Sequence, residues 1–114
     1  NAINQHPNVV ESAVVGYPHP IKGWAIYAFV ICEHKETAPD LLKQEITSTV
    51  TKHMGPFARP DKIQIVSGLP KTRSGKIMRR ILRKIAEGDI SNLGDTSTLL
   101  EPSIVVAIIN ERVE

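Results

Sequence analysis

The densest group of side chains able to do chemistry is a basic segment in the second half of the chain. It holds seven of the fourteen lysines and arginines, and no acidic residue lies between Asp61 and Glu87. The seven are Lys71, Arg73, Lys76, Arg79, Arg80, Arg83 and Lys84. The net charge of the chain is only +2, so the positive charge is concentrated locally, and such a field attracts anions such as phosphates.

Residues 70–76 form a loop that adds geometry to this charge. The small and hydroxyl side chains of Thr72, Ser74 and Gly75 leave backbone N–H groups able to face an anion. We expect a helix from about Lys76 to Glu87, whose N-terminus adds a partial positive charge at the same place. A lysine at a helix N-terminus is repelled unless an anion compensates it, so Lys76 indicates a ligand.

Two other interpretations of this segment compete with a phosphate site. A nucleotide-binding P-loop is excluded, because it requires Gly and Ser or Thr where this chain has Pro70 and Ile77. The expected helix places Ile77, Ile81 and Ile85 on one stripe, opposite the basic residues. Basic amphipathic helices bind membranes or nucleic acid, but periodicity alone favours a helix that packs on a core with a solvated basic face.

Composition and cysteine content set the protein class. A chain of 114 residues with 41% hydrophobic and 23% charged residues is typical of one soluble domain, here residues 1–114. No apolar stretch approaches the length of a membrane span, and the first residues lack the pattern of a signal peptide. Cys32 is alone and lies in the apolar run 26–32, so we interpret it as a small buried strand residue in a cytoplasmic protein.

Hydrophobic spacing and turn residues predict the elements that position this segment. We expect a helix end within residues 1–6, strands at 9–15, 26–32 and 63–66, and a turn at 16–20. A helix is expected from a capping box at Thr37 and Asp40 to Gly55-Pro56, with the apolar stripe Leu42, Ile46, Val50 and His53 or Met54. The helix 76–87 is followed by a connection at 88–101 and by a last helix from Pro102 to Ile109. The strand 26–32 is apolar on both faces and is therefore expected at the centre of the sheet. The fold class is α+β, with a small mixed sheet of about three strands flanked by helices.

Residues 70–85 are recognisable as a whole. They read Pro70-Lys71-Thr72-Arg73-Ser74-Gly75-Lys76-Ile77-Met78-Arg79-Arg80 and continue into Ile81-Leu82-Arg83-Lys84-Ile85. This run resembles the C-terminal lysine motif of adenylate-forming enzymes, in the version typical of acetyl-CoA synthetase. Three further segments resemble the same family, and with the motif they span nearly the whole chain: Val14-Val15-Gly16-Tyr17-Pro18-His19 with Ile21-Lys22-Gly23, Gly55-Pro56-Phe57-Ala58, and Leu93-Gly94-Asp95-Thr96-Ser97-Thr98-Leu99.

The resemblance implies that this chain is the mobile C-terminal domain of an acetate–CoA ligase that forms AMP, without the large N-terminal adenylation domain and the hinge. In that family ATP and acetate give acetyl-adenylate, and CoA then displaces AMP. Lys76 is by resemblance the lysine that bridges acetate and the α-phosphate, and the domain rotates between the two half-reactions. The cofactors implied are ATP, CoA and Mg²⁺, bound largely by the missing domain. The same lysine is reversibly acetylated in many members, so a lysine acetyltransferase and a deacetylase are implied as partners of Lys76.

A structural cation, often magnesium, is the second site that the resemblance implies. The match falls on Asn4, His6 and Val9, with His6 as the side-chain ligand and backbone carbonyls completing the set. Taken without the resemblance, His6 is a surface residue that caps a helix end.

Some positions depart from the family pattern or leave the function open. Thr51, with Lys52 beside it, stands where relatives can hold an arginine for the phosphate of CoA, and Trp24 stands where they carry a polar residue. Propionate is an alternative to acetate, because the acyl pocket belongs to the missing domain. A nucleic-acid-binding module is the alternative from another class; the aromatic content of 4% gives it little support.

Overall fold

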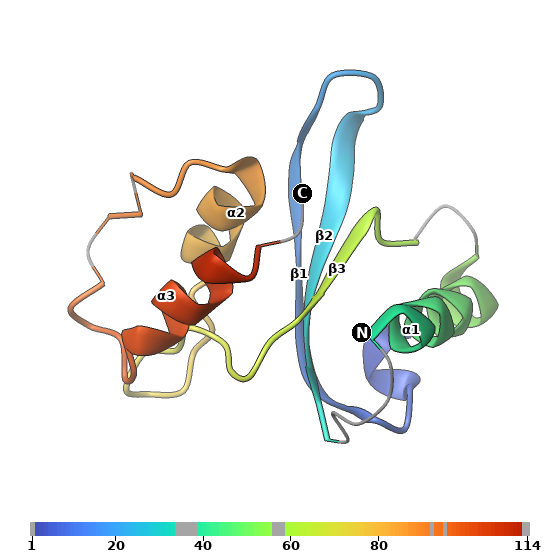
Figure 1. Cartoon of the computed structure of the whole chain (residues 1–114), viewed down its shortest axis with the longest axis horizontal. Coiled ribbons are helices and arrows are strands. Elements are labelled where there is room, and N and C mark those ends of the chain that lie inside the picture. Colours follow the sequence, from blue (N-terminus) through green and yellow to red (C-terminus); the bar gives the residue numbers. More distant parts are fainter. Residues whose placement is uncertain (1, 34–38, 56–58, 92, 95, 113–114) are drawn as a thin grey trace.

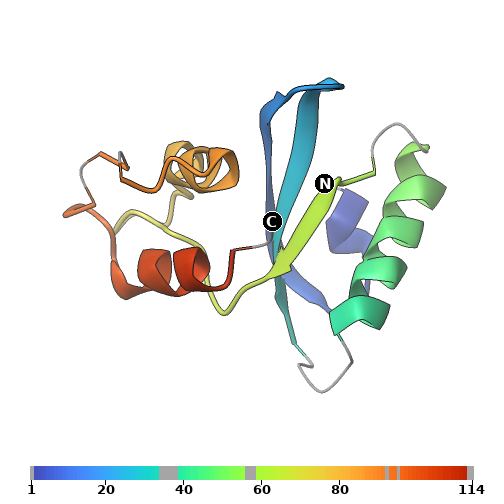
Figure 2. The same cartoon turned by 45° about the horizontal axis from the view of Figure 1, so that its top comes forward.

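The computed structural model describes residues 2–33, 39–55, 59–91, 93–94 and 96–112. A central sheet separates two groups of helices (Figure 1). The elements in chain order are η1 (Ala2–Gln5), β1 (Val9–His19), β2 (Gly23–Cys32), α1 (Pro39–Met54), β3 (Lys62–Ile65), α2 (Arg79–Glu87) and α3 (Ser103–Asn110). The short 3-10 helix η1 and α1 lie on one face of the sheet, and α2 and α3 lie on the other (Figures 1 and 2).

The sheet is mixed and has three strands in the order β1-β2-β3. β1 pairs with β2 antiparallel, whereas β2 pairs with β3 parallel. The four central residues of β2, Tyr27 to Val30, are each 0% exposed, because helices cover both faces of this strand. The α+β class, the mixed sheet and the central position of β2 are therefore confirmed.

The hairpin between β1 and β2 is longer than predicted. Residues 16–20 are not all turn: β1 continues to His19, which pairs with Gly23. The predicted turn is wrong for a physical reason. Pro18 pairs with Trp24 on an edge strand, where a residue has only one partner strand and a missing N–H is tolerated.

Alternation along β2 divides the buried side chains into two clusters. Tyr27 and Phe29 face a cluster with α2 and α3, whereas Ala28 and Val30 face a cluster with α1 and η1. The predicted stripe of α1 is buried as far as Val50, but Met54 is 65% exposed. Gly55 ends this helix at φ +88°, as predicted, whereas Thr37 of the expected capping box and Pro56 lie outside the described residues. No helix in the described ranges is long and apolar enough to cross a membrane.

A buried polar link joins the strands to the last helix. The Tyr27 hydroxyl donates to Gln64 Oε1 at 2.7 Å, and Gln64 Nε2 donates to the Ile108 carbonyl at 2.9 Å. Gln64 is only 2% exposed, so these two bonds satisfy an amide that would otherwise be costly to bury. Cys32 is 3% exposed and burial raises its pKa, which confirms its interpretation as a buried strand residue.

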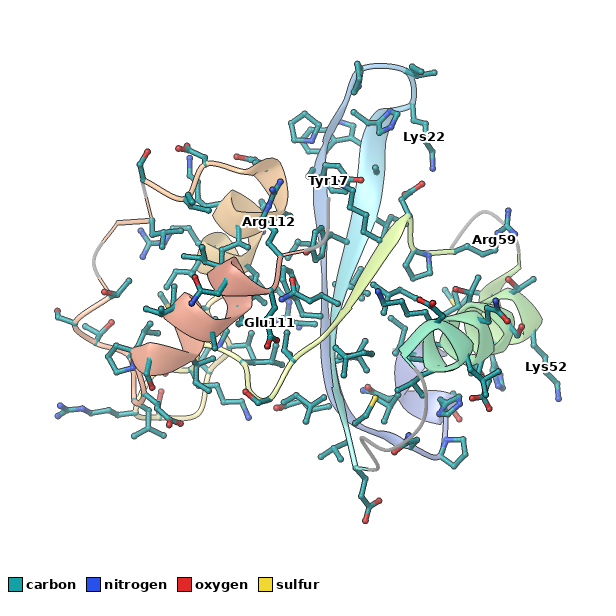
Figure 3. The ribbon with its side chains drawn as sticks, viewed as in Figure 1. Tyr17, Lys22, Lys52, Arg59, Glu111 and Arg112 are labelled. Atoms are coloured by element: carbon teal, nitrogen blue, oxygen red, sulfur yellow. The ribbon has the colours of Figure 1, made fainter. Side chains whose placement is uncertain are left out.

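Asp61 joins the turn end of the β1–β2 hairpin to the start of β3 and gives a pH-dependent prediction. Its carboxylate accepts from the Ile26 amide at 2.7 Å and from the Lys22 ammonium, and Figure 3 shows Lys22 extending from the hairpin. Burial raises the pKa of Asp61, but the bonds from Lys22 and Ile26 outweigh it and hold the pKa below 3.8. The stability that Asp61 contributes is therefore complete above pH 3.8 and is lost as the pH falls through the lower pKa of the folded state.

Urea unfolding of the wild-type domain and of Asp61→Asn at a series of pH values measures this contribution. We expect the wild type to be the more stable near pH 6 and the difference to shrink as the pH falls below 3.8. A difference that stayed constant down to pH 2 would contradict the assignment.

Candidate functional site

Lys76 lies at the exposed tip of a tight hairpin whose two ends are fixed in the core. Leu69 and Pro70 are buried on the entering side, while Ile77 and Met78 pack against the cluster of α2 and α3 on the leaving side. Residues 73–76 are exposed between them. The ends are held together by the bridge between Lys71 and Ile77 and by the Met78 amide, which donates to the Pro70 carbonyl at 2.8 Å.

Hydrogen bonds within the hairpin fix the backbone of Lys76. The Thr72 amide donates to the Lys76 carbonyl and the Gly75 amide donates to the Thr72 carbonyl, each at 2.9 Å. The Lys76 amide donates to Thr72 Oγ1 at 3.2 Å. Gly75 has φ +89°, a conformation that suits glycine. The backbone is thus held while the side chain of Lys76 extends into solvent.

One sequence-based expectation about this loop is wrong, and another holds for only part of the loop. The helix begins at Arg79, not near Lys76, because Ile77 and Met78 are pairing with Lys71 and Pro70 in extended backbone. The amides of Thr72, Gly75 and Lys76 donate within the loop, so they do not face an anion. Lys76 therefore does not stand at a helix N-terminus, and the positive charge beside it comes from the side chains.

The seven basic side chains divide into paired and unpaired groups. Lys71 binds Glu11 at 2.8 Å and Lys84 lies 3.4 Å from Asp89. The other five are exposed and form no salt bridge with another described residue. These are Arg73, Lys76, Arg79, Arg80 and Arg83. Lys76 is the lysine of the hairpin whose charge is left available to a ligand.

The apolar side of α2 is part of the core. Ile81, Leu82, Ile85 and Ala86 are buried, and the first three are 0% exposed. The interpretation of a core-packing helix with a solvated basic face is confirmed. The apolar stripe is therefore not exposed for a membrane or a partner.

Residues 96–100 lie beside the lysine hairpin, which the sequence did not predict. Thr72 forms a bridge with Leu99, and the Leu100 amide donates to the Lys71 carbonyl at 2.9 Å. Leu99 is 3% exposed, so it fastens the hairpin to the core. The signal in the sequence was the apolar pair Leu99-Leu100 near the end of a mostly polar connection. A shallow hollow of about 520 Å³ separates the two segments and is lined by Thr72, Arg73, Ser74, Ser97 and Thr98.

The implied cation site at Asn4, His6 and Val9 stays a prediction, and the geometry of His6 does not favour its imidazole as a ligand. His6 is buried, and its Nδ1 accepts from the Asn8 amide at 3.1 Å. A neutral imidazole then carries its proton on Nε2, which lies 3.9 Å from the Glu45 carboxylate, so neither nitrogen offers a lone pair to a metal. The Asn4 side chain accepts from Ser12 at 2.7 Å. Among the described residues there is no group of three or more His, Cys, Asp or Glu side chains able to hold a metal ion.

The departures from the family pattern lie on the α1 side of the sheet and at the hairpin. The Thr51 hydroxyl donates to the Thr47 carbonyl at 2.9 Å, so it is engaged within α1. Lys52 and Arg59 extend into solvent on the α1 side (Figure 3). Trp24 is 67% exposed, and nothing in the structure explains an aromatic residue there.

Solved structures share this arrangement of sheet and helices. The structure matches acetoacetyl-CoA synthetase from Streptomyces lividans with a TM-score of 0.75 at 22% identity, over 96% of this chain and 16% of that one. It also matches the Brucella canis acyl-CoA synthetase with a TM-score of 0.67 at 44% identity, over 73% of this chain and 15% of that one. The fold is that of the C-terminal domain of adenylate-forming enzymes.

The chain belongs to the family of AMP-binding enzyme C-terminal domains, whose sequence model matches residues 1–76. It is 59% identical over 112 residues to the acetyl-coenzyme A synthetase of Parvibaculum lavamentivorans. This alignment covers 98% of the chain but only 17% of that relative. The similarity thus extends through α2 and α3, beyond the part matched by the family model.

Proposed function

We propose that this chain is the C-terminal domain of an AMP-forming acetyl-CoA synthetase and that Lys76 supplies the charge that adenylation requires. The observation that carries the proposal is the exposed ammonium of Lys76 on a hairpin anchored in the core, within a chain 59% identical to an acetyl-coenzyme A synthetase. The N-terminal adenylation domain, which we propose as its partner, holds the pocket for ATP and acetate. The cytoplasmic location predicted from the sequence is part of this proposal.

The chemistry explains why a lysine at the tip of a hairpin suits the first half-reaction. An acetate oxygen attacks the α-phosphorus of ATP, and the bond to pyrophosphate breaks. Two anions must approach and negative charge builds on the phosphoryl oxygens, so a positioned ammonium lowers the barrier without forming a covalent bond. The Mg²⁺ that accompanies ATP would neutralise further charge within the N-terminal domain.

The second half-reaction requires Lys76 to leave. The CoA thiol attacks the acetyl carbonyl of the adenylate, and AMP departs. A separate small domain can withdraw its lysine by rotation and present another face to CoA, which a residue fixed in the pocket could not do. The cation implied at Asn4, His6 and Val9 has no step in this mechanism, because the imidazole of His6 is engaged by Asn8.

Acetylation of Lys76 is a further part of the proposal. The side chain is exposed, so a lysine acetyltransferase and a deacetylase could reach it, and acetylation would remove the charge. Mass spectrometry of the enzyme after incubation with an acetyltransferase and acetyl-CoA would locate the modification. Adenylation activity should fall in proportion to acetylation at Lys76, and full activity at complete occupancy would contradict this role.

ATP–pyrophosphate exchange by the full-length enzyme tests the proposed reaction. We expect exchange that depends on acetate and that is faster with acetate than with propionate at equal concentration. Faster exchange with propionate would favour a propionyl-CoA synthetase. Absence of exchange with either acid, together with salt-dependent oligonucleotide binding lost on replacing Arg79, Arg80 and Arg83, would favour a nucleic-acid-binding module.

A further inference from the structure

Thr72 is the residue at which the hydrogen bonds of the hairpin tip meet. Its amide donates to the Lys76 carbonyl and its carbonyl accepts from the Gly75 amide, each at 2.9 Å. Its hydroxyl oxygen accepts from the Lys76 amide at 3.2 Å and lies 2.9 Å from the Ser74 hydroxyl. Thr72 therefore contacts both polar backbone groups of Lys76, one through its own backbone and one through its side chain.

Thr72 is held more firmly than the exposed tip of the hairpin. Thr72 is half-buried and forms a bridge with Leu99, which is 3% exposed within the cluster of α2 and α3. Lys71, next to it, accepts from the Leu100 amide and binds Glu11 of β1. Residues 73–76 are exposed. Thr72 thus lies in the fixed part of the hairpin, and its hydroxyl accepts from the backbone amide of Lys76 at the exposed tip.

We propose that Thr72 is a positioning residue for Lys76: its hydroxyl holds the backbone from which the ammonium reaches the reacting phosphoryl group. This inference rests on the proposed function. A lysine side chain has four rotatable bonds, and the position of its backbone sets the region that its ammonium can reach. Small displacements of a group that must meet a transition state reduce the rate markedly, so a fixed starting point raises the fraction of time spent in the productive position.

The size of the effect follows from the exposure of the loop. Water can replace a hydrogen bond lost at residues 73–76, so the net free energy that one such bond contributes is that of an ordinary intramolecular hydrogen bond. That corresponds to roughly a three- to tenfold change in an equilibrium or a rate. Valine has nearly the shape of threonine and keeps the backbone bonds of residue 72, so Thr72→Val removes the hydroxyl alone.

The experiment uses the full-length enzyme and measures the two half-reactions separately. For Thr72→Val we expect acetate-dependent ATP–pyrophosphate exchange to fall about three- to tenfold in kcat, with the KM values for ATP and acetate nearly unchanged. Thioester formation from supplied acetyl-adenylate and CoA should be unchanged. Thr72→Ser keeps a hydroxyl and should restore most of the rate. Thr49→Val is the matched control, because the Thr49 hydroxyl bonds the Glu45 carbonyl on the exposed side of α1, and it should exchange at the wild-type rate.

A double-mutant cycle shows whether Thr72 acts through Lys76. Adding Thr72→Val to Lys76→Ala should cause no further loss of exchange. An equal loss in both backgrounds, or no loss from Thr72→Val in the wild type, would overturn the inference while leaving the role of Lys76 intact. Exchange at the wild-type rate by Lys76→Ala itself would overturn the proposed function, and with it this inference. Failure of Thr72→Ser to recover activity would show that the hydroxyl is not the group that matters.

Discussion

Replacing Lys76 by alanine in the full-length enzyme should slow acetate-dependent ATP–pyrophosphate exchange by about a hundredfold to a thousandfold, the usual result of removing one preorganised group that stabilises developing charge. Thioester formation from supplied acetyl-adenylate should be nearly unaffected, because in the proposed function the domain withdraws Lys76 before that half-reaction. Single-turnover measurement of each half-reaction separates the two effects. The stability of the domain should hardly change, because Lys76 is exposed and forms no salt bridge with another described residue.

A matched control removes a different lysine from the same domain. Lys43 lies on α1, on the opposite face of the sheet from the lysine hairpin, and Lys43→Ala should keep both half-reactions at the wild-type rate. Equal loss of adenylation and thioester formation in Lys76→Ala would contradict the assigned role. It would indicate that the lysine supports the whole domain and not one chemical step.

Replacing Phe29 by alanine should destabilise the domain by about 3–5 kcal/mol, the range observed for deleting a buried aromatic side chain. Phe29 is 0% exposed at the centre of β2 and stacks on Tyr27 with ring centroids 4.5 Å apart. The lost burial and the cavity left behind act together, and a small domain has only about 5–15 kcal/mol of stability in total. Urea unfolding of the isolated domain, monitored by far-ultraviolet circular dichroism, measures the change.

Trp24 provides the control for this prediction, because it is an aromatic residue on the same strand but is 67% exposed. Trp24→Ala should change the free energy of unfolding by about 0.5 kcal/mol or less. A similar loss from both variants would show that the position of Phe29 in the core is not the source of its contribution.

Much of the fold follows from local patterns that the sequence displays directly. The apolar run 26–32 predicts a central strand, and the spacing of Leu42, Ile46 and Val50 predicts the buried face of α1; both are confirmed. Pro102 and the apolar residues after it predict α3, which runs over Ser103–Asn110. These predictions succeed because periodicity, glycine and proline act within a few residues of themselves.

Predictions failed where pairing between segments decides the backbone. Residues 16–20 are of types that favour turns, yet pairing with β2 extends β1 as far as His19. Lys76 was expected to begin a helix, yet the pairing of Ile77 with Lys71 delays α2 to Arg79. In both places a partner strand supplies hydrogen bonds that outweigh the local preference of the sequence.

The amino-acid sequence alone predicts the α+β class, the concentration of positive charge in residues 71–84, and the place of Lys76 within a motif typical of adenylate-forming enzymes. The folded structure shows which basic groups remain available: Glu11 pairs with Lys71 and Asp89 with Lys84, whereas Lys76 is unpaired among the described residues. It also placed the buried Leu99 against Thr72 and so fixed the base of the lysine hairpin. The physical reason is that charge, composition and periodicity are properties of neighbouring residues, whereas pairing and burial depend on segments that meet only when the chain folds.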